Sequence, residues 1–436
     1  MEKKTTLLPF STIIGFGSKF QGTEKVHGAP LGPEIVAKTK TLLGFDPAKS
    51  FFVDTDVAAR FEARKAEGAE REKAWNELFK KYAAAHPDLA KEFERRVIKK
   101  ELPQGWKDNL PKFTPADKAV GTRKYSEGVL LKLAAALPEI VGGSADLTGS
   151  NYTLIGSDFQ KDTPAGRYFR FGVREHGMAA ICNGLFAYGG LIPFGATFLN
   201  FMGYAQGAYR LSALSHFGVL YIGTHDSIGL GEDGPTHQPI ETLESIRATP
   251  NIFTMRPADG NETTGCYIVA IENRHTPSIL AFSRQNAPNL EGSTIEKVAK
   301  GAYILQDVEK PQVIFISTGT EVSICVDAGK KLAEAGIKVR VVSMPISELF
   351  DQQPVDYKNT VLPDGIPIIS VEAATTRGWA KYAHYSIGLD HWGASAPASQ
   401  VYQKFGITPD AVANKAKSVV EYYSKNPVPS LHRPVF

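Results

Sequence analysis

A glycine-rich loop over residues 223–239 holds His225 and His237 together with the acidic residues Glu232 and Asp233. The loop follows the apolar run 217–222, which is typical of a strand buried in a parallel sheet. Ligands of open parallel sheets bind outside the carboxyl ends of the strands, and imidazole exchanges protons near neutral pH. The pattern therefore predicts the rim of an active site.

Two further features should lie at the same edge of the sheet. Glu175 stands where the apolar segment 168–173 gives way to a helix of small residues, so its carboxylate faces the ligand crevice or, alternatively, only stabilises the start of its helix. Phe198, Phe201 and Tyr204 recur every three residues where another strand turns into a helix. They form either an aromatic wall for a ligand or part of the core.

Composition is that of a globular chain with several domains. The 436 residues are 43% hydrophobic and 22% charged, and a formal net charge of +3 does not indicate nucleic-acid binding. Cys182, Cys266 and Cys325 are widely spaced, which favours core thiols over disulfides or a metal cluster. Pro9 and polar neighbours interrupt the first apolar stretch, and no run is long enough to span a membrane, so we expect neither a signal peptide nor a membrane segment.

The alternation of strands and helices predicts an α/β fold, with two consecutive, mostly parallel, three-layer domains after a helical linker. We expect a glycine-rich appendage at 1–32, the linker at 33–110 and the two α/β domains at 111–297 and 298–436. The expected strands are 139–142, 168–173, 191–194, 218–224, 251–256, 278–283, 313–317, 338–343 and 366–371. The expected helices are 57–67, 72–85, one from 175, 200–215, one opening at Pro239, 262–272, 321–335 and 411–424.

Several blocks, taken together and in this order, resemble the transketolase family. They are residues 26–30, 122–124, 143–147, 172–176, 198–201, 224–239, 256–260 and 283–286. The resemblance runs over essentially the whole chain. It implies the thiamine-diphosphate-binding fold followed by the transketolase C-terminal domain. The implied activity is transfer of a two-carbon ketol unit from a ketose phosphate to an aldose phosphate, as in the pentose phosphate pathway and the Calvin cycle.

The same resemblance implies a role for each site residue. Glu175 would hydrogen-bond the aminopyrimidine ring of the cofactor, and the catalytic residues would be Glu175, His237 and His27. The other cofactor contacts would be Phe198, Phe201, Tyr204 and Asp146. The substrate contacts would be His27 and His237 near the reacting hydroxyls, Asp233 at another hydroxyl, and Arg123, Ser150, His225 and Arg284 at the phosphate.

The family's Gly-Asp-Gly sequence, which holds the metal and the diphosphate, does not occur in this chain. Residues 5–17 resemble the last strand of the domain that carries it. We therefore expect thiamine diphosphate with Mg²⁺ or Ca²⁺ whose ligands come from that domain, no metal ligand in this chain, and little activity from the chain alone. Sugar phosphates would be the substrates. We also expect a homodimer, or pairing with a chain that supplies the diphosphate-binding domain. The expected compartment is the cytoplasm, with a plastid as the alternative.

Four other interpretations need weighing. Residues 229–234 match a dinucleotide-binding glycine pattern, but Pro235 and Pro239 delay the helix that this pattern requires, which argues against a nicotinamide-dependent dehydrogenase. Dihydroxyacetone synthase and the β-subunit of 2-oxoacid dehydrogenases are thiamine-dependent relatives; the loop histidines argue against the latter. A non-catalytic, dimerising or regulatory transketolase fragment is the remaining alternative.

Overall fold

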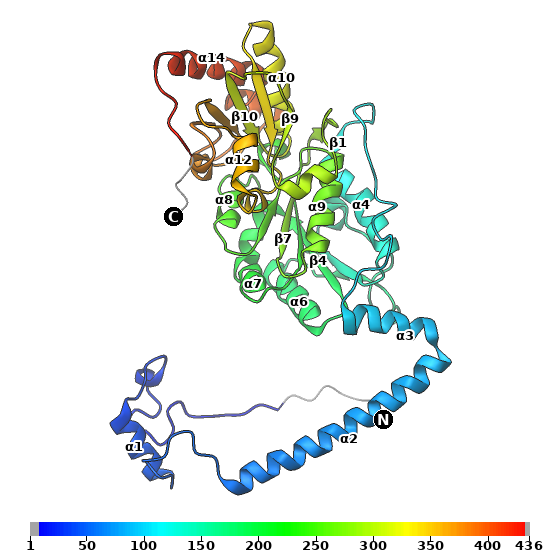
Figure 1. Cartoon of the computed structure of the whole chain (residues 1–436), viewed down its shortest axis with the longest axis vertical. Coiled ribbons are helices and arrows are strands. Elements are labelled where there is room, and N and C mark those ends of the chain that lie inside the picture. The colour runs from blue at the N-terminus through cyan, green and yellow to red at the C-terminus, as the bar shows by residue number, and fades with distance from the viewer. Residues whose placement is uncertain (1–7, 432–436) are drawn as a thin grey trace. The chain divides into compact units, whose positions relative to one another are not determined.

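The computed structural model describes residues 8–431, and the chain divides into two compact units, Met1–Ala90 and Lys91–Phe436 (Figure 1). The first unit contains η1 (Glu24–Val26), α1 (Pro33–Leu42) and α2 (Thr55–Ala85), and α3 (Pro87–Phe93) crosses into the second. One long helix, α2, replaces the two helices expected at 57–67 and 72–85, because Gly68 costs a helix only about 1 kcal/mol. Trp75 and Phe79 stack on its surface with ring centroids 5.2 Å apart.

The strand expected over residues 5–17 is wrong for the described part of that segment. Residues 5–7 lie outside the described residues, and residues 8–17 form irregular chain and turns. A strand needs a neighbour for its backbone hydrogen bonds. None of residues 8–90 is in a strand, so no such neighbour is available in the first unit.

The second unit opens with η2 (Glu94–Lys99) and then forms a six-stranded parallel sheet in the order β3-β2-β4-β5-β7-β6. Its strands are β2 (Ile140–Ser144), β3 (Tyr168–Arg170), β4 (Ile192–Phe198), β5 (Leu220–Thr224), β6 (Phe253–Met255) and β7 (Ser278–Phe282). Its helices are α4 (Thr122–Ala136), α5 (Thr148–Asn151), α6 (Glu175–Tyr188), η3 (Leu199–Phe201), α7 (Met202–Leu214), η4 (Ile228–Leu230), α8 (Thr242–Arg247) and α9 (Gly260–Glu272).

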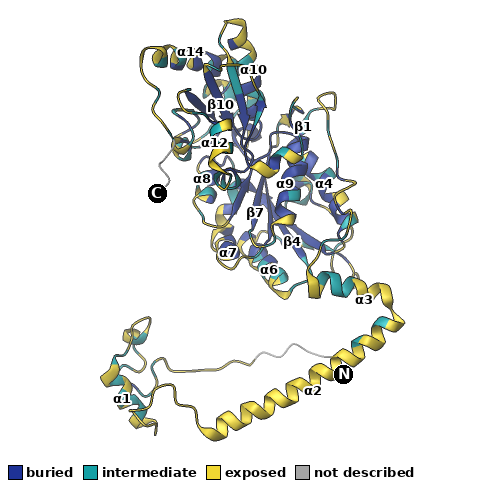
Figure 2. Cartoon of the chain, viewed as in Figure 1, coloured by how far each residue is buried: buried dark blue, intermediate teal, exposed yellow. Residues whose placement is uncertain are grey.

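Helices cover both faces of this sheet. Successive side chains of a strand point to opposite faces, and in these strands the side chains on both faces are apolar and need to be buried. In β5, Leu220 and Ile222 pack in the core beneath α4 and α9, whereas Tyr221 packs in the core beneath α6 and α7. The strands are therefore buried on both sides, as the dark blue interior of Figure 2 shows. This is the three-layer arrangement expected for a parallel sheet.

A second sheet of five strands follows in the order β13-β12-β10-β11-β9. Its strands are β9 (Tyr303–Gln306), β10 (Val313–Ser317), β11 (Val339–Ser343), β12 (Ile368–Val371) and β13 (Tyr385–Ile387). Its helices are η5 (Glu296–Lys300), α10 (Glu321–Glu334), α11 (Ser347–Asp351), α12 (Val355–Val361), η6 (Arg377–Lys381), α13 (Ala398–Lys404) and α14 (Pro409–Lys425). Within it only β9 runs antiparallel to its neighbour.

The architecture confirms the α/β fold with two mostly parallel sheets, and several details differ from expectation. The helix expected to open at Pro239 begins at Thr242. The short strands β9 and β13 were missed, as was the two-stranded antiparallel pair of β1 (Val120–Gly121) and β8 (Asn286–Ala287). Each of these strands has only two to four residues, too few for an alternating pattern to stand out.

Candidate functional site

The carboxyl ends of five parallel strands of the first sheet deliver the candidate residues to one edge. Asp146 follows β2, Glu175 follows β3, and Phe198 is the last residue of β4. His225 follows β5, and Arg284 follows β7. In a parallel sheet these ends share one edge, which is where ligands bind. The sheet therefore places residues that are up to 138 positions apart, from Asp146 to Arg284, along one edge.

Glu175 is the first residue of α6 and is only 7% exposed. The hydroxyl of Thr197, in β4, donates to its Oε1 at 3.3 Å. The start of a helix carries partial positive charge, which stabilises a carboxylate there. Glu175 is thus a buried acceptor held between the start of a helix and a central strand.

The aromatic residues form a continuous wall that begins at the end of β4, next in the chain to Thr197, the hydrogen-bond partner of Glu175. The rings of Phe198 and Phe201 stack with centroids 5.6 Å apart, and the ring of Tyr204 follows 5.9 Å from that of Phe201. Phe198 is buried, whereas Tyr204 is 71% exposed. A purely structural stripe would bury all three rings, so the exposed end leaves aromatic surface available at this edge of the sheet.

His237 stands edge-on to this wall, with its ring centroid 5.3 Å from that of Phe201. Its Nδ1 lies 2.9 Å from the hydroxyl of Thr236, and Asn200 donates to the carbonyl of Thr236 at 2.7 Å. The loop that carries His237 is therefore tied to the chain segment that carries the wall.

His225 is buried and has a positive backbone φ of 60°, a conformation that is rare for residues other than glycine. Its ring stacks on Phe198 with centroids 3.8 Å apart. Burial, together with the positive charges of Arg123 and Arg284, lowers the pKa of His225 to about 3. The imidazole is therefore neutral near pH 7.

Arg123 and Arg284 bring positive charge close to His225. Nη1 of Arg123 donates to the backbone carbonyl of Ser150 at 2.8 Å and lies 3.5 Å from Nε2 of His225. Arg284 is exposed, and its Nη1 donates to the carbonyl of Leu230 at 3.0 Å. Burial lowers the pKa of Arg123, and the charge of Arg284 contributes in the same direction, so the two guanidinium groups are close enough to repel.

The remaining candidates are less closely tied to these groups. Asp233 is exposed in the loop after β5, and Asp146 is exposed after β2 with a positive φ of 60°. His27 caps the C-terminal end of η1 in the first unit and is exposed. Its place near the reacting hydroxyls stays a prediction.

The second sheet's domain holds the histidine loop by contacts that the sequence did not reveal. Gln238 is 1% exposed and pairs with the backbone of Ala394 in both directions, at 2.9 Å and 3.1 Å. Ser395 donates to the carbonyl of Glu232. These contacts join positions far apart in the chain, and although Gln238 lay within a recognised block, nothing in its neighbours indicated a partner near residue 394.

A buried ion cluster lies beside the same loop. Arg256 is fully buried, donates to Asp226 at 2.9 Å and pairs with Glu321 at the start of α10. Glu372 accepts from Arg247 at 2.8 Å, and charge from Arg247 and Arg256 outweighs burial to lower the pKa of Glu372 to about 2. Asp226, which follows His225, is therefore connected through the charge of Arg256 to Glu321 in the second sheet's domain.

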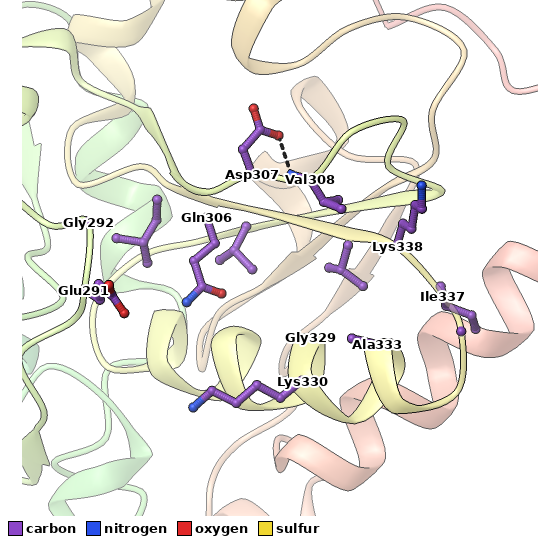
Figure 3. Close-up of a pocket in the computed structure, with 14 residues that line it drawn as sticks. Glu291, Gly292, Gln306, Asp307, Val308, Gly329, Lys330, Ala333, Ile337 and Lys338 are labelled. Carbon is purple, nitrogen blue, oxygen red and sulfur yellow. Dashed lines mark hydrogen bonds between the residues drawn. The ribbon is translucent and has the colours of Figure 1, made fainter.

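An open hollow lies elsewhere in the second unit. It has a volume of about 690 Å³ and lies between α10 and the strands β9 and β11 (Figure 3). Lys330 at its edge is paired with Asp327 at 2.8 Å, and Asp307 is paired with Arg340 at 2.8 Å. It contains none of the candidate residues.

Among residues 8–431, no group of three or more histidine, cysteine, aspartate or glutamate side chains is arranged to hold a metal ion. In the part of the chain that the structure describes, no helix is both long enough and apolar enough to cross a membrane.

Three sequence models of known families match the chain in consecutive segments. The transketolase thiamine diphosphate binding domain matches residues 1–103, the transketolase pyrimidine binding domain matches 118–289, and the transketolase-like C-terminal domain matches 301–408. The first match extends beyond residue 32 and through most of the segment that we interpreted as a linker. More of the chain is therefore similar to the N-terminal domain than the sequence patterns indicated.

Individual relatives agree. The chain is 52% identical to a transketolase of Scheffersomyces stipitis, over 99% of this chain and 65% of that protein, and 49% identical to a probable transketolase of Schizosaccharomyces pombe, over 99% and 64%. It thus spans slightly less than two thirds of these relatives. A solved transketolase of Pichia stipitis in complex with sedoheptulose 7-phosphate superposes with a TM-score of 0.94 at 51% identity, over 98% of this chain and 64% of that one.

These comparisons do not favour the dehydrogenase, dihydroxyacetone synthase or non-catalytic alternatives. Similarity over nearly the whole chain, matching domain models in the family's order, and a sheet edge that gathers the recognised residues all lead to one assignment: this chain belongs to the transketolase family.

Proposed function

We propose that this chain forms the pyrimidine side and the C-terminal part of a transketolase, which transfers a two-carbon ketol unit from a ketose phosphate to an aldose phosphate. The observation that carries the proposal is the buried carboxylate of Glu175 at the same edge of the sheet as the aromatic wall of Phe198, Phe201 and Tyr204. The resemblance to solved transketolases over nearly the whole chain supports it.

These residues fit the aminopyrimidine ring of thiamine diphosphate. A flat heteroaromatic ring can stack on the exposed aromatic surface at Tyr204, and a ring nitrogen can share its hydrogen with the buried oxygen acceptor at Glu175. When bound, this cofactor supplies the carbon nucleophile that the reaction requires. Glu175 holds a proton at the ring nitrogen, and the wall excludes water and fixes the orientation of the ring. Asp146, at the same edge, is proposed as a further contact.

The loop residues would manage the hydroxyl groups of the sugar. His237 is half-buried beside Phe201, where an imidazole can accept a proton from a hydroxyl and return it near neutral pH. Asp233 is exposed in the same loop, and its carboxylate can accept a hydrogen bond from another hydroxyl. We propose His27 as a second histidine at the reacting hydroxyls.

The substrate phosphate would bind at the two guanidinium groups. Arg123 and Arg284 repel one another, and a dianionic phosphate between them would remove that repulsion. Ser150 lies at the same place, since its carbonyl accepts from Arg123. His225 completes this end of the crevice as a neutral ring.

The diphosphate and its metal ion would be held by residues outside this sequence, either in more of the same polypeptide or in a second chain. The described residues contain no metal-binding group of side chains, and the relatives extend well beyond the matched region. We propose magnesium or calcium as the ion, a homodimer or a complementing chain as the assembly, the pentose phosphate or Calvin cycle as the pathway, and the cytoplasm as the compartment.

A complementation assay tests this proposal. The chain is mixed with thiamine diphosphate, magnesium and the part of the Scheffersomyces stipitis transketolase that this chain does not match, and transfer from a ketose phosphate to ribose 5-phosphate is followed. Turnover that requires both polypeptides supports the proposal. A correctly assembled complex that binds the cofactor without transferring a ketol unit contradicts it.

A further inference from the structure

Three buried side chains connect His225 to the interior of the sheet. Nδ1 of His225 lies 2.8 Å from the hydroxyl of Thr224, which lies 2.6 Å from Oδ1 of Asn151. Nδ2 of Asn151 lies 2.8 Å from the hydroxyl of Ser144. The side chains come from β2, α5 and the end of β5, and Ser144, Asn151 and Thr224 are fully buried. Which atom donates in each of these hydrogen bonds decides which ring nitrogen of His225 carries the hydrogen.

The donor in each hydrogen bond can be assigned in turn, beginning with Ser144, which contacts the backbone. The Ser144 hydroxyl accepts from the N–H of Leu147 at 3.2 Å and donates its only hydrogen to the carbonyl of Ala196 at 3.1 Å. It has no second hydrogen to offer Asn151, so Asn151 must donate to it through Nδ2. The amide orientation is therefore fixed, and the carbonyl Oδ1 faces Thr224.

The same reasoning continues to the imidazole. A carbonyl oxygen can only accept, so the hydroxyl hydrogen of Thr224 points to Asn151. Thr224 can then only accept from His225, which places the ring hydrogen on Nδ1. In a neutral ring, Nε2 is consequently left with a lone pair.

The other side of the ring leads independently to the same conclusion. Nε2 lies 3.5 Å from Nη1 of Arg123, and a guanidinium group has donors only. A hydrogen on Nε2 would face it without an acceptor. The low pKa of His225, caused first by burial and then by Arg123, Arg284 and His237, keeps the ring neutral.

We propose that Ser144, Asn151 and Thr224 are positioning residues that hold His225 in the Nδ1–H tautomer, so that Nε2 presents a hydrogen-bond acceptor to the crevice. His225 then orients the guanidinium group of Arg123 and does not bind a phosphate as a cation. The tautomer itself can be measured without turnover. Only its consequence for the substrate rests on the proposed function.

Nuclear magnetic resonance of the full chain with ¹⁵N-labelled histidine tests the tautomer. Long-range proton–nitrogen correlations distinguish a protonated from an unprotonated ring nitrogen, and His225→Gln identifies the signals of His225. At pH 7 we expect Nδ1 protonated and Nε2 unprotonated. A hydrogen on Nε2, or a doubly protonated ring, overturns the proposal whatever the variants do.

Two substitutions at Thr224 test the relay, that is, the series of hydrogen bonds from Ser144 through Asn151 and Thr224 to His225. Thr224→Val removes the acceptor while keeping the shape of the side chain, so the His225 signals should shift toward a mixture of tautomers; Thr224→Ser restores the hydroxyl and should restore the wild-type signals. Thr263→Val is the matched control, because that buried threonine donates only to the carbonyl of Asp259 in its own helix. Unchanged His225 signals in folded Thr224→Val overturn the relay.

Asn151→Ala provides a second route if the valine variant does not fold. It frees the Thr224 hydroxyl to donate to Nδ1, which should raise the Nε2–H population. Unchanged signals in folded Asn151→Ala overturn the role of Asn151.

In the complemented enzyme, Thr224→Val should raise KM for phosphorylated acceptors about tenfold with a smaller change in kcat, and Thr224→Ser should not. If no transfer activity is found at all, the proposed function fails while the tautomer measurement still stands.

Discussion

The imidazole ring of His225 stacks on the ring of Phe198, with centroids 3.8 Å apart and an angle of 30° between the planes. The two residues lie at the ends of the adjacent strands β5 and β4. This contact joins the aromatic wall to the guanidinium group of Arg123. The proposed cofactor side and the proposed phosphate side of the crevice are therefore parts of one packed structure.

Glu175→Gln tests the carboxylate directly. The substitution keeps the size of the side chain but removes its negative charge, so it can no longer hold the proton at the cofactor ring. We expect kcat in the complemented assembly to fall by roughly 10²-fold or more, the usual contribution of a general acid or base. Steady-state kinetics measure this, with Glu296→Gln, an exposed residue of η5, as the control. Equal activity of both variants would remove Glu175 from the mechanism.

Arg284→Ala tests the phosphate end. Loss of a charged hydrogen-bond donor costs about 1.5–3 kcal/mol, so KM for phosphorylated acceptors should rise about tenfold or more. The KM for unphosphorylated aldehydes should change little, because they place no anion there. Lys417→Ala, on the exposed face of α14, removes the same charge elsewhere and serves as the control. Equal losses for both kinds of acceptor would contradict the assignment.

Gln238→Ala tests whether the C-terminal domain holds the histidine loop. Removing this buried amide leaves the backbone groups of Ala394 unpaired, so the free energy of unfolding should fall by about 1–3 kcal/mol. Hydrogen exchange should also become faster in residues 229–238. Gln403→Ala, an exposed glutamine on α13, is the control. If exchange in the loop is unchanged while global stability falls, Gln238 is only a packing residue.

The depressed pKa of His225 makes a prediction about stability. A free histidine titrates near pH 6.5, whereas in the folded chain the pKa of His225 is about 3 because the ring is buried near positive charges. Between these values the unfolded chain binds the extra proton. The stabilising contribution of neutral His225 is therefore present above pH 6.5 and is lost as the pH falls toward 3, by up to about 1.4 kcal/mol per pH unit.

Urea denaturation of the wild type and His225→Gln from pH 7 to pH 4 measures this effect. The wild type should lose stability relative to the variant as the pH falls, because only the wild type carries the buried imidazole. Parallel curves would show that His225 titrates normally. The comparison removes the contributions of the other ionisable groups, which the two proteins share.

Much of the fold was predictable from local patterns, because a parallel sheet buried on both faces leaves continuous apolar runs. The run ending at Thr224 and the run around Val313 both became central strands. Residues 303–306 alternate between buried and half-buried positions over only four residues, and the edge strand β9 was missed. The helix begins at Thr242 and not at the expected Pro239, because a proline is compatible with the first turn of a helix but does not require a helix to begin there.

The candidate site was predictable only in part. Glu175, Phe198 and His225 carry their own chemical signals at the ends of strands, so their convergence follows from the sheet. Ser144 and Asn151 carry no such signal. Their importance arises from hydrogen bonds with side chains 7 and 73 positions away, and such pairings appear only once the strands are in register.

A structure of the chain assembled with the complementing domain, magnesium and thiamine diphosphate tests the central claim most directly. The account predicts the aminopyrimidine ring against Phe198 and Phe201, with a ring nitrogen within hydrogen-bond distance of the Glu175 carboxylate. A bound cofactor whose ring lies away from this wall, with Glu175 turned toward bulk water, would contradict it.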